Sequence, residues 1–331
     1  MTVNMSLFVL PPDVTQLADS NTTVSQLTEF LILGGELGLN EFYTELSIIL
    51  LVVYLLVLMG NLTILTLVVA DHRLHTPMYI LLSNLSFIDI VITTTVMPKM
   101  ISVCIKNDMA ISISGCFLQM YFYLSLQSVE SFLLTVMAYD RYVAICKPLH
   151  YKTIVTNGVC ALLAVTAWIL GLCGAAVAVI LATQLPFCNN KVFFWFCDYP
   201  PVVRLACIDT TFLIDLALGL ALVVMYFPFT VIVWSYSKII LSVFRIASSD
   251  GHLKAFSTCS SHLIVVLTFY LAHSCVYISA KSQNVPQRAL MVISIVNCFL
   301  TPLVNPIVYS FRNKEIKRAL RKHFPRKRTF P

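Results

Sequence analysis

The chain has 331 residues, of which 58% are apolar and only 11% are charged, and its formal net charge is +6. Soluble domains carry roughly 25% charged residues, so this composition excludes an ordinary water-soluble domain and indicates a membrane protein. The sequence has no Gly-rich phosphate loop, no HExxH and no GxSxG motif, which argues against an enzyme.

Seven apolar blocks follow one another along the chain, each about as long as the ~20 residues that a helix needs to cross a bilayer. A backbone in lipid must satisfy its own hydrogen bonds, so each block is predicted to be a helix. The runs are too long for barrel strands and do not alternate. We therefore predict an all-α, seven-helix transmembrane bundle. The blocks lie near residues 45–70, 78–102, 113–138, 159–182, 210–243, 257–280 and 288–310.

Basic residues are distributed unevenly around these blocks. Residues 1–44 contain no Lys or Arg, whereas the segment after the seventh block is rich in both. Because cytoplasmic segments carry the excess of basic residues, we predict that the N-terminus lies outside. The expected organisation is an extracellular segment (1–44), a transmembrane domain (45–310) and a basic cytoplasmic tail (311–331) that begins with a short amphipathic helix. The positive charge would then face anionic membrane lipid rather than nucleic acid.

Two glycosylation sequons begin at Asn4 and Asn21, within the segment predicted to be extracellular. The apolar run near the N-terminus has no basic residues ahead of it, so we expect no cleaved signal peptide. The first transmembrane helix would then serve as the anchor.

Four cysteines are predicted to lie on the outer side. Cys188, Cys197 and Cys207 belong to the long loop between the fourth and fifth helices, and Cys116 begins the third helix. In an oxidising compartment four cysteines allow three different pairings. Spacing in the sequence does not choose among them.

Several polar residues fall within the predicted transmembrane helices, namely Asn61, Asp89, Glu130, Asn297 and Asn305. Such residues are expensive to bury and are functional candidates by default. Asp89 and Glu130 both lie near mid-span, and two neighbouring carboxylates cannot both stay ionised without a cation or a shared proton. The alternatives are a hydrogen-bonded structural cluster and a sodium or proton site that biases a conformational change.

Six motifs occur in order on predicted helices one, two, three, five, six and seven. With them the chain resembles the odorant (olfactory) receptors, a branch of the rhodopsin-like G-protein-coupled receptors. The motifs are "GNLTIL" (60–65), "LHTPMYILLSNLSFIDI" (74–90), "MAYDRYVAICKPLHY" (137–151), "SYSKIILSVFRI" (235–246), "KAFSTCSSHLIVV" (254–266) and "PLVNPIVYSFRN" (302–313).

The resemblance implies a receptor that binds a small odorant and activates a heterotrimeric stimulatory G protein, which raises cyclic AMP. It implies a multi-pass protein of the plasma membrane, in olfactory sensory cilia. No enzymatic activity and no cofactor are expected, and a structural sodium ion at Asp89 and Glu130 stays one of the alternatives given above for these two carboxylates.

The resemblance also assigns roles to individual residues. Asp140 would hold Arg141 in the resting state, and Arg141 would meet the G protein in the active state. It implies the disulfides Cys116–Cys197 and Cys188–Cys207. The other positions that it implies for coupling or switching are Tyr142, Tyr236, Asn305, Pro306 and Tyr309.

A ligand cavity is expected among the third, fifth, sixth and seventh helices. Cys116 and Arg141 are separated by 25 residues, or about 37 Å of helix, and a polar and aromatic stripe begins a short way below Cys116. The stripes on these two helices are Met120, Tyr123, Leu124, Gln127, Ser128 and Ser131, and Tyr270, His273, Ser274 and Tyr277. The resemblance adds Leu220, Ala221, Val224, Ile295 and Cys298.

These residues describe an apolar cavity with a few hydrogen-bonding groups, which suits a small, mostly apolar ligand with one polar group. Neither stripe contains an acid, which argues against an amine held by a salt bridge. Asp215, near the outer end of the fifth helix, is the nearest candidate exception.

Other membrane proteins fit the sequence less well. A transporter would favour internal repeats and broken helices at matching positions, and a channel would need a pore-lining polar stripe. A retinal-binding opsin would need a lysine in the seventh helix, and residues 289–311 contain none. The closest rival is a receptor for a non-olfactory metabolite, which would share the mechanism.

Overall fold

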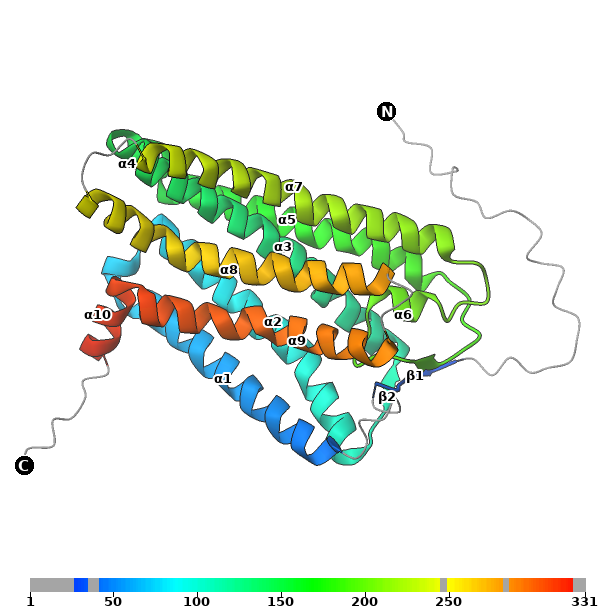
Figure 1. The fold of residues 1–331 in the computed structure, drawn as a ribbon. Coiled ribbons are helices and arrows are strands. Elements are labelled where there is room, and N and C mark those ends of the chain that lie inside the picture. Colours follow the sequence, from blue (N-terminus) through cyan, green and yellow to red (C-terminus); the bar gives the residue numbers. More distant parts are fainter. Residues whose placement is uncertain (1–26, 35–41, 245–248, 282–285, 324–331) are drawn as a thin grey trace, which may run out of the picture.

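The computed structural model describes residues 27–34, 42–244, 249–281 and 286–323, and each of the seven predicted transmembrane segments is a helix in it. The helices pack side by side as an elongated bundle (Figure 1). The long helices are α1 (Tyr43–Ala70), α2 (Pro77–Lys106), α3 (Ile113–Cys146), α5 (Asn157–Thr183), α7 (Thr211–Val243), α8 (Ser249–Lys281) and α9 (Gln287–Arg312). The short helices are α4 (Tyr151–Ile154), α6 (Tyr199–Val203) and α10 (Lys314–His323).

Six of the long helices are apolar and long enough to cross a membrane, and α3 is the exception. It packs against α2, α5, α7 and α8, so protein rather than lipid surrounds much of it. A helix in that position can carry polar residues that a lipid-facing helix cannot. Its buried polar residues are Gln119, Ser125, Gln127, Glu130, Ser131 and Asp140.

Local sequence explains where several helices begin and end. Ser112 caps α3, because its hydroxyl accepts a hydrogen bond from the backbone N–H of Gly115 at 3.1 Å. Thr156 caps α5 in the same way. Pro77 begins α2, at a position where its missing N–H costs nothing. Asn107, with a φ of 52°, ends that helix in the left-handed conformation.

A small three-stranded sheet covers one end of the bundle and is an exception to the all-α prediction. Strand β1 (Glu29–Ile32) lies between β2 (Ala110–Ser112), to which it is antiparallel, and β3 (Lys191–Val192), to which it is parallel. Phe30 of β1 is fully buried, with its ring 5.3 Å from that of Phe187. The sheet therefore fastens a part of the N-terminal segment to the helices.

Two disulfides organise the long loop (184–210) at the same end. Cys116 at the start of α3 is joined to Cys197, and Cys188 is joined to Cys207. This end, where β1, β2 and α6 lie, is called the disulfide end (Figure 1). The opposite end, where α4 and α10 lie, is called the basic end.

Close packing of α1 on α9 accounts for two residues of the first motif. A Cβ at Gly60 would lie only 2.8 Å from Pro306, so the glycine allows the helices to approach. Pro306 has no N–H to bond the carbonyl of Pro302, one turn earlier. Asn61 supplies the missing donor, since its Nδ2 lies 3.0 Å from that oxygen.

Helix α10 confirms the predicted short amphipathic helix. Ile316 and Ala319 are buried on one face, whereas Lys317 and Arg321 are exposed on the other. Of the basic tail, Arg326, Lys327 and Arg328 lie outside the described residues, as do the sequons at Asn4 and Asn21.

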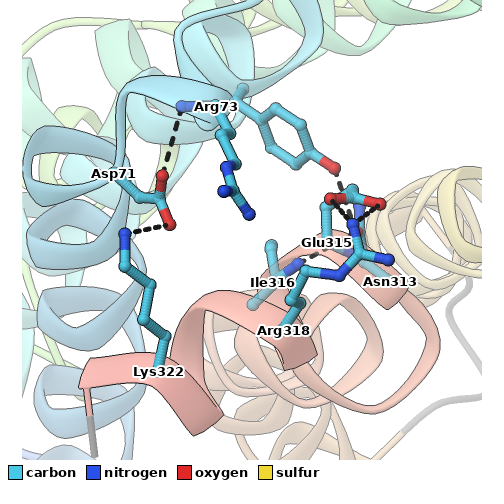
Figure 2. Close-up of polar contacts among 8 residues, drawn as sticks. Asp71, Arg73, Asn313, Glu315, Ile316, Arg318 and Lys322 are labelled. Carbon is cyan, nitrogen blue, oxygen red and sulfur yellow. Dashed lines mark hydrogen bonds and ion pairs between the residues drawn. The ribbon is translucent and has the colours of Figure 1, made fainter.

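Polar contacts fasten α10 to the rest of the basic end (Figure 2). Asn313 caps the helix by accepting from the N–H groups of Glu315 and Ile316, and Tyr79 of α2 donates to the same oxygen at 3.0 Å. Lys322 lies 3.5 Å from Asp71 at the end of α1. The hydrogen bond from the backbone of Arg73, together with Lys322, lowers the pKa of Asp71.

Candidate functional site

A cavity of about 250 Å³ opens among the helices near the long loop. Helices α3, α5, α7, α8 and α9 contribute to its wall, and the start of α6 closes part of it. Most of the lining side chains are apolar, with a few hydroxyl and amide groups among them. This composition is typical of a site for a small organic ligand.

Many residues of the predicted ligand set line this cavity. Helix α3 supplies four of them at helical spacing, and α7 and α8 supply the rest. The predicted residues in the lining are Tyr123, Leu124, Gln127, Ser128, Leu220, Ala221, Val224, His273 and Tyr277.

The other predicted residues pack behind or beside the lining. Met120 and Ile295 are buried in the core. The remaining four make contacts between helices. Tyr270 lies 2.9 Å from the hydroxyl of Ser131, Ser274 lies 2.8 Å from that of Tyr226, and Cys298 lies 3.7 Å from that of Tyr123.

The sequence did not identify the part of the wall that α5 and the long loop form. Leu170, Gly174, Ala175 and Ala178 of α5 line the cavity, and small residues at helical spacing were the available signal. Asn297 of α9 also lines it, whereas the sequence predicts this residue only as an intramembrane polar residue and not as part of the ligand set. The loop contributes Asp198, Tyr199 and Pro200.

Asp198 is an acid in the cavity wall that comes from the long loop, outside the two helical stripes expected from the sequence. Asp215, the exception expected from the sequence, is exposed and is not in the lining. Asp198 directly follows Cys197, so the disulfide to α3 holds it in the cavity wall. Its Oδ1 accepts a hydrogen bond from the N–H of Tyr199 at 2.8 Å, and burial raises its pKa to about 6.

A second group of polar residues lies in the middle of the bundle, below the cavity. Asp89 and Glu130 are almost completely buried and interact electrostatically. Asn305 of α9 donates a hydrogen bond to Asp89 at 2.8 Å. The structure thus brings together three polar residues that come from α2, α3 and α9.

Several oxygen atoms of this core have no hydrogen-bond partner among the described residues, including one carboxylate oxygen each of Asp89 and Glu130. The side-chain oxygens of Asn297, Thr301 and Asn305 share that property. Buried polar atoms without partners call for an explanation such as a water or an ion. Oxygen donors of this kind fit a hard cation such as sodium. Within the described ranges, no three His, Cys, Asp or Glu side chains come together.

The basic end carries a closed network of charges around Asp140. Its carboxylate accepts hydrogen bonds from Nε of Arg141 at 2.9 Å and from the hydroxyl of Tyr151 at 2.7 Å. Nη2 of Arg141 contacts the same carboxylate. Asp140 is buried and only 11% of the Arg141 side chain is exposed, so the arginine is held against α3 rather than extended toward solvent.

Tyrosines of α3 itself and of the neighbouring helices α7 and α9 lie around this network. Tyr236 of α7 lies 2.7 Å from Nδ1 of His262 on α8, which joins the two helices. Tyr309 of α9 is fully buried, and Tyr142 packs its ring 5.1 Å from that of Trp234. All of the residues implied in switching therefore lie in the middle of the bundle or toward its basic end.

Comparison with known families decides the identity. The sequence profile described as "Olfactory receptor" matches residues 50–327, which is most of the chain. The chain belongs to the olfactory receptor family. It is therefore a multi-pass plasma-membrane receptor of the G-protein-coupled class rather than an enzyme.

Individual olfactory receptors are similar over nearly their whole length. The chain is 44% identical to olfactory receptor 6N1 of Homo sapiens over 308 residues, or 91% of this chain and 96% of that one. It is 41% identical to olfactory receptor 10J5 of Mus musculus, with 89% and 95% covered. It is 45% identical to olfactory receptor 10A2 of Homo sapiens, with 85% and 93% covered.

The fold of this olfactory receptor is similar to that of a solved seven-helix receptor. The crystal structure of squid rhodopsin matches with a TM-score of 0.72 over 86% of this chain and 81% of that one. The identity is 16%, so this likeness concerns the fold alone. Helix α9 contains no lysine, the residue that a retinal-binding protein would need there.

Proposed function

We propose that this olfactory receptor binds a small, mostly apolar odorant in the cavity between α3, α5, α7, α8 and α9, and that binding activates a stimulatory G protein. The observation that carries the proposal is the cavity itself. It is closed in part by a disulfide-anchored loop and lined mostly by apolar side chains. A ligand with one hydrogen-bonding group would find partners there in Gln127, His273 and Tyr277.

Contacts between helices offer a route from the cavity to the basic end. Tyr123 lines the cavity and touches Cys298 of α9. About two turns further along α3, Ser131 meets Tyr270 of α8. An odorant that favours one arrangement of α8 and α9 over another would shift the receptor by its difference in affinity for the two. The basic end of α8 would then move away from α3, and Arg141 would leave Asp140 for the G protein.

The buried carboxylates suit a role as a cation or proton site. Asp89 and Glu130 each have one oxygen without a hydrogen-bond partner among the described residues, and Asn305 of α9 donates a hydrogen bond to Asp89. A sodium ion here would hold α2, α3 and α9 in the resting arrangement, and its loss would favour the active one. A structural cluster that shares one proton is the alternative.

The distribution of charge supports an outside N-terminus. The exposed basic residues of α10 and the ion pair of Arg141 share one end, and both disulfides lie at the other. Cytoplasmic segments are rich in Lys and Arg, and disulfides form in oxidising compartments. The basic end would then face the G protein and anionic lipid, and the odorant would enter at the disulfide end, in the membrane of olfactory cilia.

A cyclic-AMP screen tests the proposal. The full-length receptor is expressed with a stimulatory G protein and exposed to a panel of volatile compounds that have one polar group each. We expect concentration-dependent cyclic AMP for a subset of the panel. A response limited to non-volatile metabolites would instead favour a receptor outside olfaction.

A matched pair of glycine variants tests the cavity. A Cβ added at Gly174, in the lining, or at Gly219, outside it, would meet nothing within 4 Å. Gly174→Leu should therefore fill the cavity and abolish the response to every agonist of the panel, with surface expression retained. Gly219→Leu should respond as the wild type. An unchanged response in Gly174→Leu would show that the odorant binds elsewhere.

A further inference from the structure

Asp198 is the one charged residue among the described residues that line the cavity. It lies on the part of the wall that the long loop forms, whereas His273, Tyr277 and the α3 residues come from the helices. The electric field inside this mostly apolar space therefore has one fixed negative source, at its loop side. Because the surroundings have a low dielectric, that source acts more strongly than it would in water.

Aromatic residues surround the same region. Tyr199 is the neighbour of Asp198 in the chain, and Tyr123 and Tyr277 line the cavity with it. Both Tyr123 and Tyr277 are close enough to Asp198 to interact with it electrostatically. An acid beside several tyrosine rings is the arrangement that proteins use to hold organic cations, because the faces of the rings attract positive charge.

No cation of the described part of the chain pairs with Asp198. The ion pairs found there join Lys99 to Asp108, Arg141 to Asp140, Arg318 to Glu315 and Lys322 to Asp71. The hydrogen bond that Asp198 accepts comes from the N–H of Tyr199 and occupies Oδ1. Asp198 is half-buried, and a partly desolvated carboxylate without a cationic partner is stabilised when it gains one.

We propose that Asp198 is a specificity-determining residue of the odorant site and that it selects ligands with a protonated amine attached to a small apolar body. The carboxylate receives the ammonium group at the loop side of the cavity, and the apolar body occupies the space between α3, α5 and α7. The inference rests on the proposed function, since it concerns the same cavity. It narrows the ligand from a compound with any one polar group to an aliphatic amine.

A purely structural role for Asp198 is the competing explanation, because its side chain caps α6. The two roles respond differently to one substitution. Asparagine caps a helix about as well as aspartate, so Asp198→Asn keeps the hydrogen bond to Tyr199 and removes only the charge. A structural role predicts that Asp198→Asn leaves ligand binding unchanged, whereas a ligand role predicts a selective loss of amine binding.

The experiment uses the purified full-length receptor and two probes of nearly equal shape, cyclohexylmethylamine and cyclohexylmethanol. Ligand binding is measured as the rise in thermal unfolding temperature over a concentration series, which requires no G protein. We expect the wild type to bind the amine about tenfold more tightly than the alcohol, or more, because hydrogen bonds to charged groups are the stronger ones. Asp198→Asn should bring the two affinities close together.

A control and a second variant secure the result. Asp209→Asn removes an acid of the same loop that lies outside the lining and bonds Thr211, so it should retain the wild-type preference. Serine also caps helices, so Asp198→Ser repeats the test if the asparagine variant is not recovered folded.

The pH dependence of ligand binding gives an independent test. Burial raises the pKa of Asp198 to about 6, and the amine remains protonated throughout the range used. Lowering the pH from about 7.5 to about 5 neutralises the carboxylate, so amine binding should weaken as the pH falls, while alcohol binding stays constant. The other titratable groups near Asp198 are Tyr123, Tyr199, Tyr277, His273 and Cys298. The pH effect must therefore disappear in Asp198→Asn to be assigned to this residue.

Three results would overturn the inference. They are an amine that fails to stabilise the wild type, an amine no tighter than the alcohol, and a preference that persists in Asp198→Asn. A receptor that responds to neutral volatiles but is indifferent to the amine would keep the proposed function and lose this inference. Amine binding that produces no cyclic AMP would keep this inference and contradict the proposed function.

Discussion

The two ends of α3 differ in their open volume and in their charge. Near the disulfide end, Tyr123, Leu124, Gln127 and Ser128 face a cavity, and their neighbours on α5 are glycine and alanine. At the basic end, Asp140 and Arg141 are buried against each other and against Tyr151. The cavity end of α3 therefore has open volume and few charged groups, whereas the basic end has an ion pair and little open volume.

Because of this difference, substitutions at the two ends of α3 should affect two different properties of the receptor. If the odorant binds in the cavity as proposed, a change there should alter how tightly it binds, because each lining group would contribute one contact. On the proposed mechanism, a change at the ion pair should alter whether the receptor can reach its active arrangement, because a buried charge pair that loses one partner leaves the other uncompensated. The polar core around Asp89 lies between the two regions, and we propose that it couples them.

The largest expected effect is at the basic end. Arg141→Ala should abolish the cyclic-AMP response at every agonist concentration, with ligand binding and surface expression retained, because the arginine is proposed to meet the G protein. Cyclic AMP, surface labelling and a binding assay are measured together. Arg318→Ala, which removes an exposed arginine of α10 paired with Glu315, serves as the control and should signal normally. Normal signalling by surface-expressed Arg141→Ala would contradict the mechanism.

The disulfide end should respond to loss of its covalent link. Cys197→Ser leaves Cys116 without its partner and frees the loop that carries Asp198. Removing a native disulfide costs about 2–5 kcal/mol, so surface expression should fall sharply. Cys173→Ser, a change of a free and exposed cysteine, is the matched control and should traffic normally. Full expression and ligand response in Cys197→Ser would show that the bridge is dispensable.

The polar core can be tested through sodium. If Asp89 and Glu130 hold a sodium ion, raising the sodium concentration should lower basal nucleotide exchange by the G protein in receptor membranes. Asp89→Asn should remove this dependence. Asp108→Asn, which changes an acid paired with Lys99 near the end of α2, should leave it intact. A sodium response that survives in Asp89→Asn would reject the shared ion and leave the structural cluster.

Substitutions in the cavity should shift potency without changing the maximal response. Tyr277→Phe and His273→Ala each remove one hydrogen-bonding group of about 0.5–1.5 kcal/mol, or roughly two- to thirteen-fold in potency. Dose–response curves for an agonist from the volatile panel provide the measurement. Cys275→Ser, at an exposed position of the same helix, should leave the curve unchanged. A lower maximum with unaltered potency would place these residues in the switch rather than the cavity.

The smallest effects are expected where α10 meets the bundle. Asn313→Ala removes the cap of α10 and should lower stability by about 1 kcal/mol, whereas Asp71→Asn should change it less, since Lys322 is 56% exposed. The pKa of Asp71 is lowered from 3.8. Its stabilising contribution is therefore complete at neutral pH and is lost only as the pH falls through the lowered pKa. Thermal unfolding near neutral pH shows which variant loses more stability. A larger loss in Asp71→Asn than in Asn313→Ala would contradict the prediction.

The sequence was sufficient for the helices and for much of the ligand face. Hydrophobic length is a local property, so all seven transmembrane helices could be predicted, and helical spacing placed Tyr123, Leu124, Gln127 and Ser128 on one face of α3. The order of the motifs indicated the family before any fold was known. The basic, amphipathic pattern after the seventh helix was likewise enough to predict α10.

Only the tertiary structure decided what stands opposite those faces. Hydropathy separates lipid from protein surroundings, but it does not say which neighbour a buried residue meets, so the α5 wall and the bond from Asn61 to the carbonyl of Pro302 were not predictable. Strand β1 depends on partners far away in the chain. Asp198 reaches the cavity because Cys197 is bonded to α3, and the path of a loop follows from where it is tied rather than from its own composition.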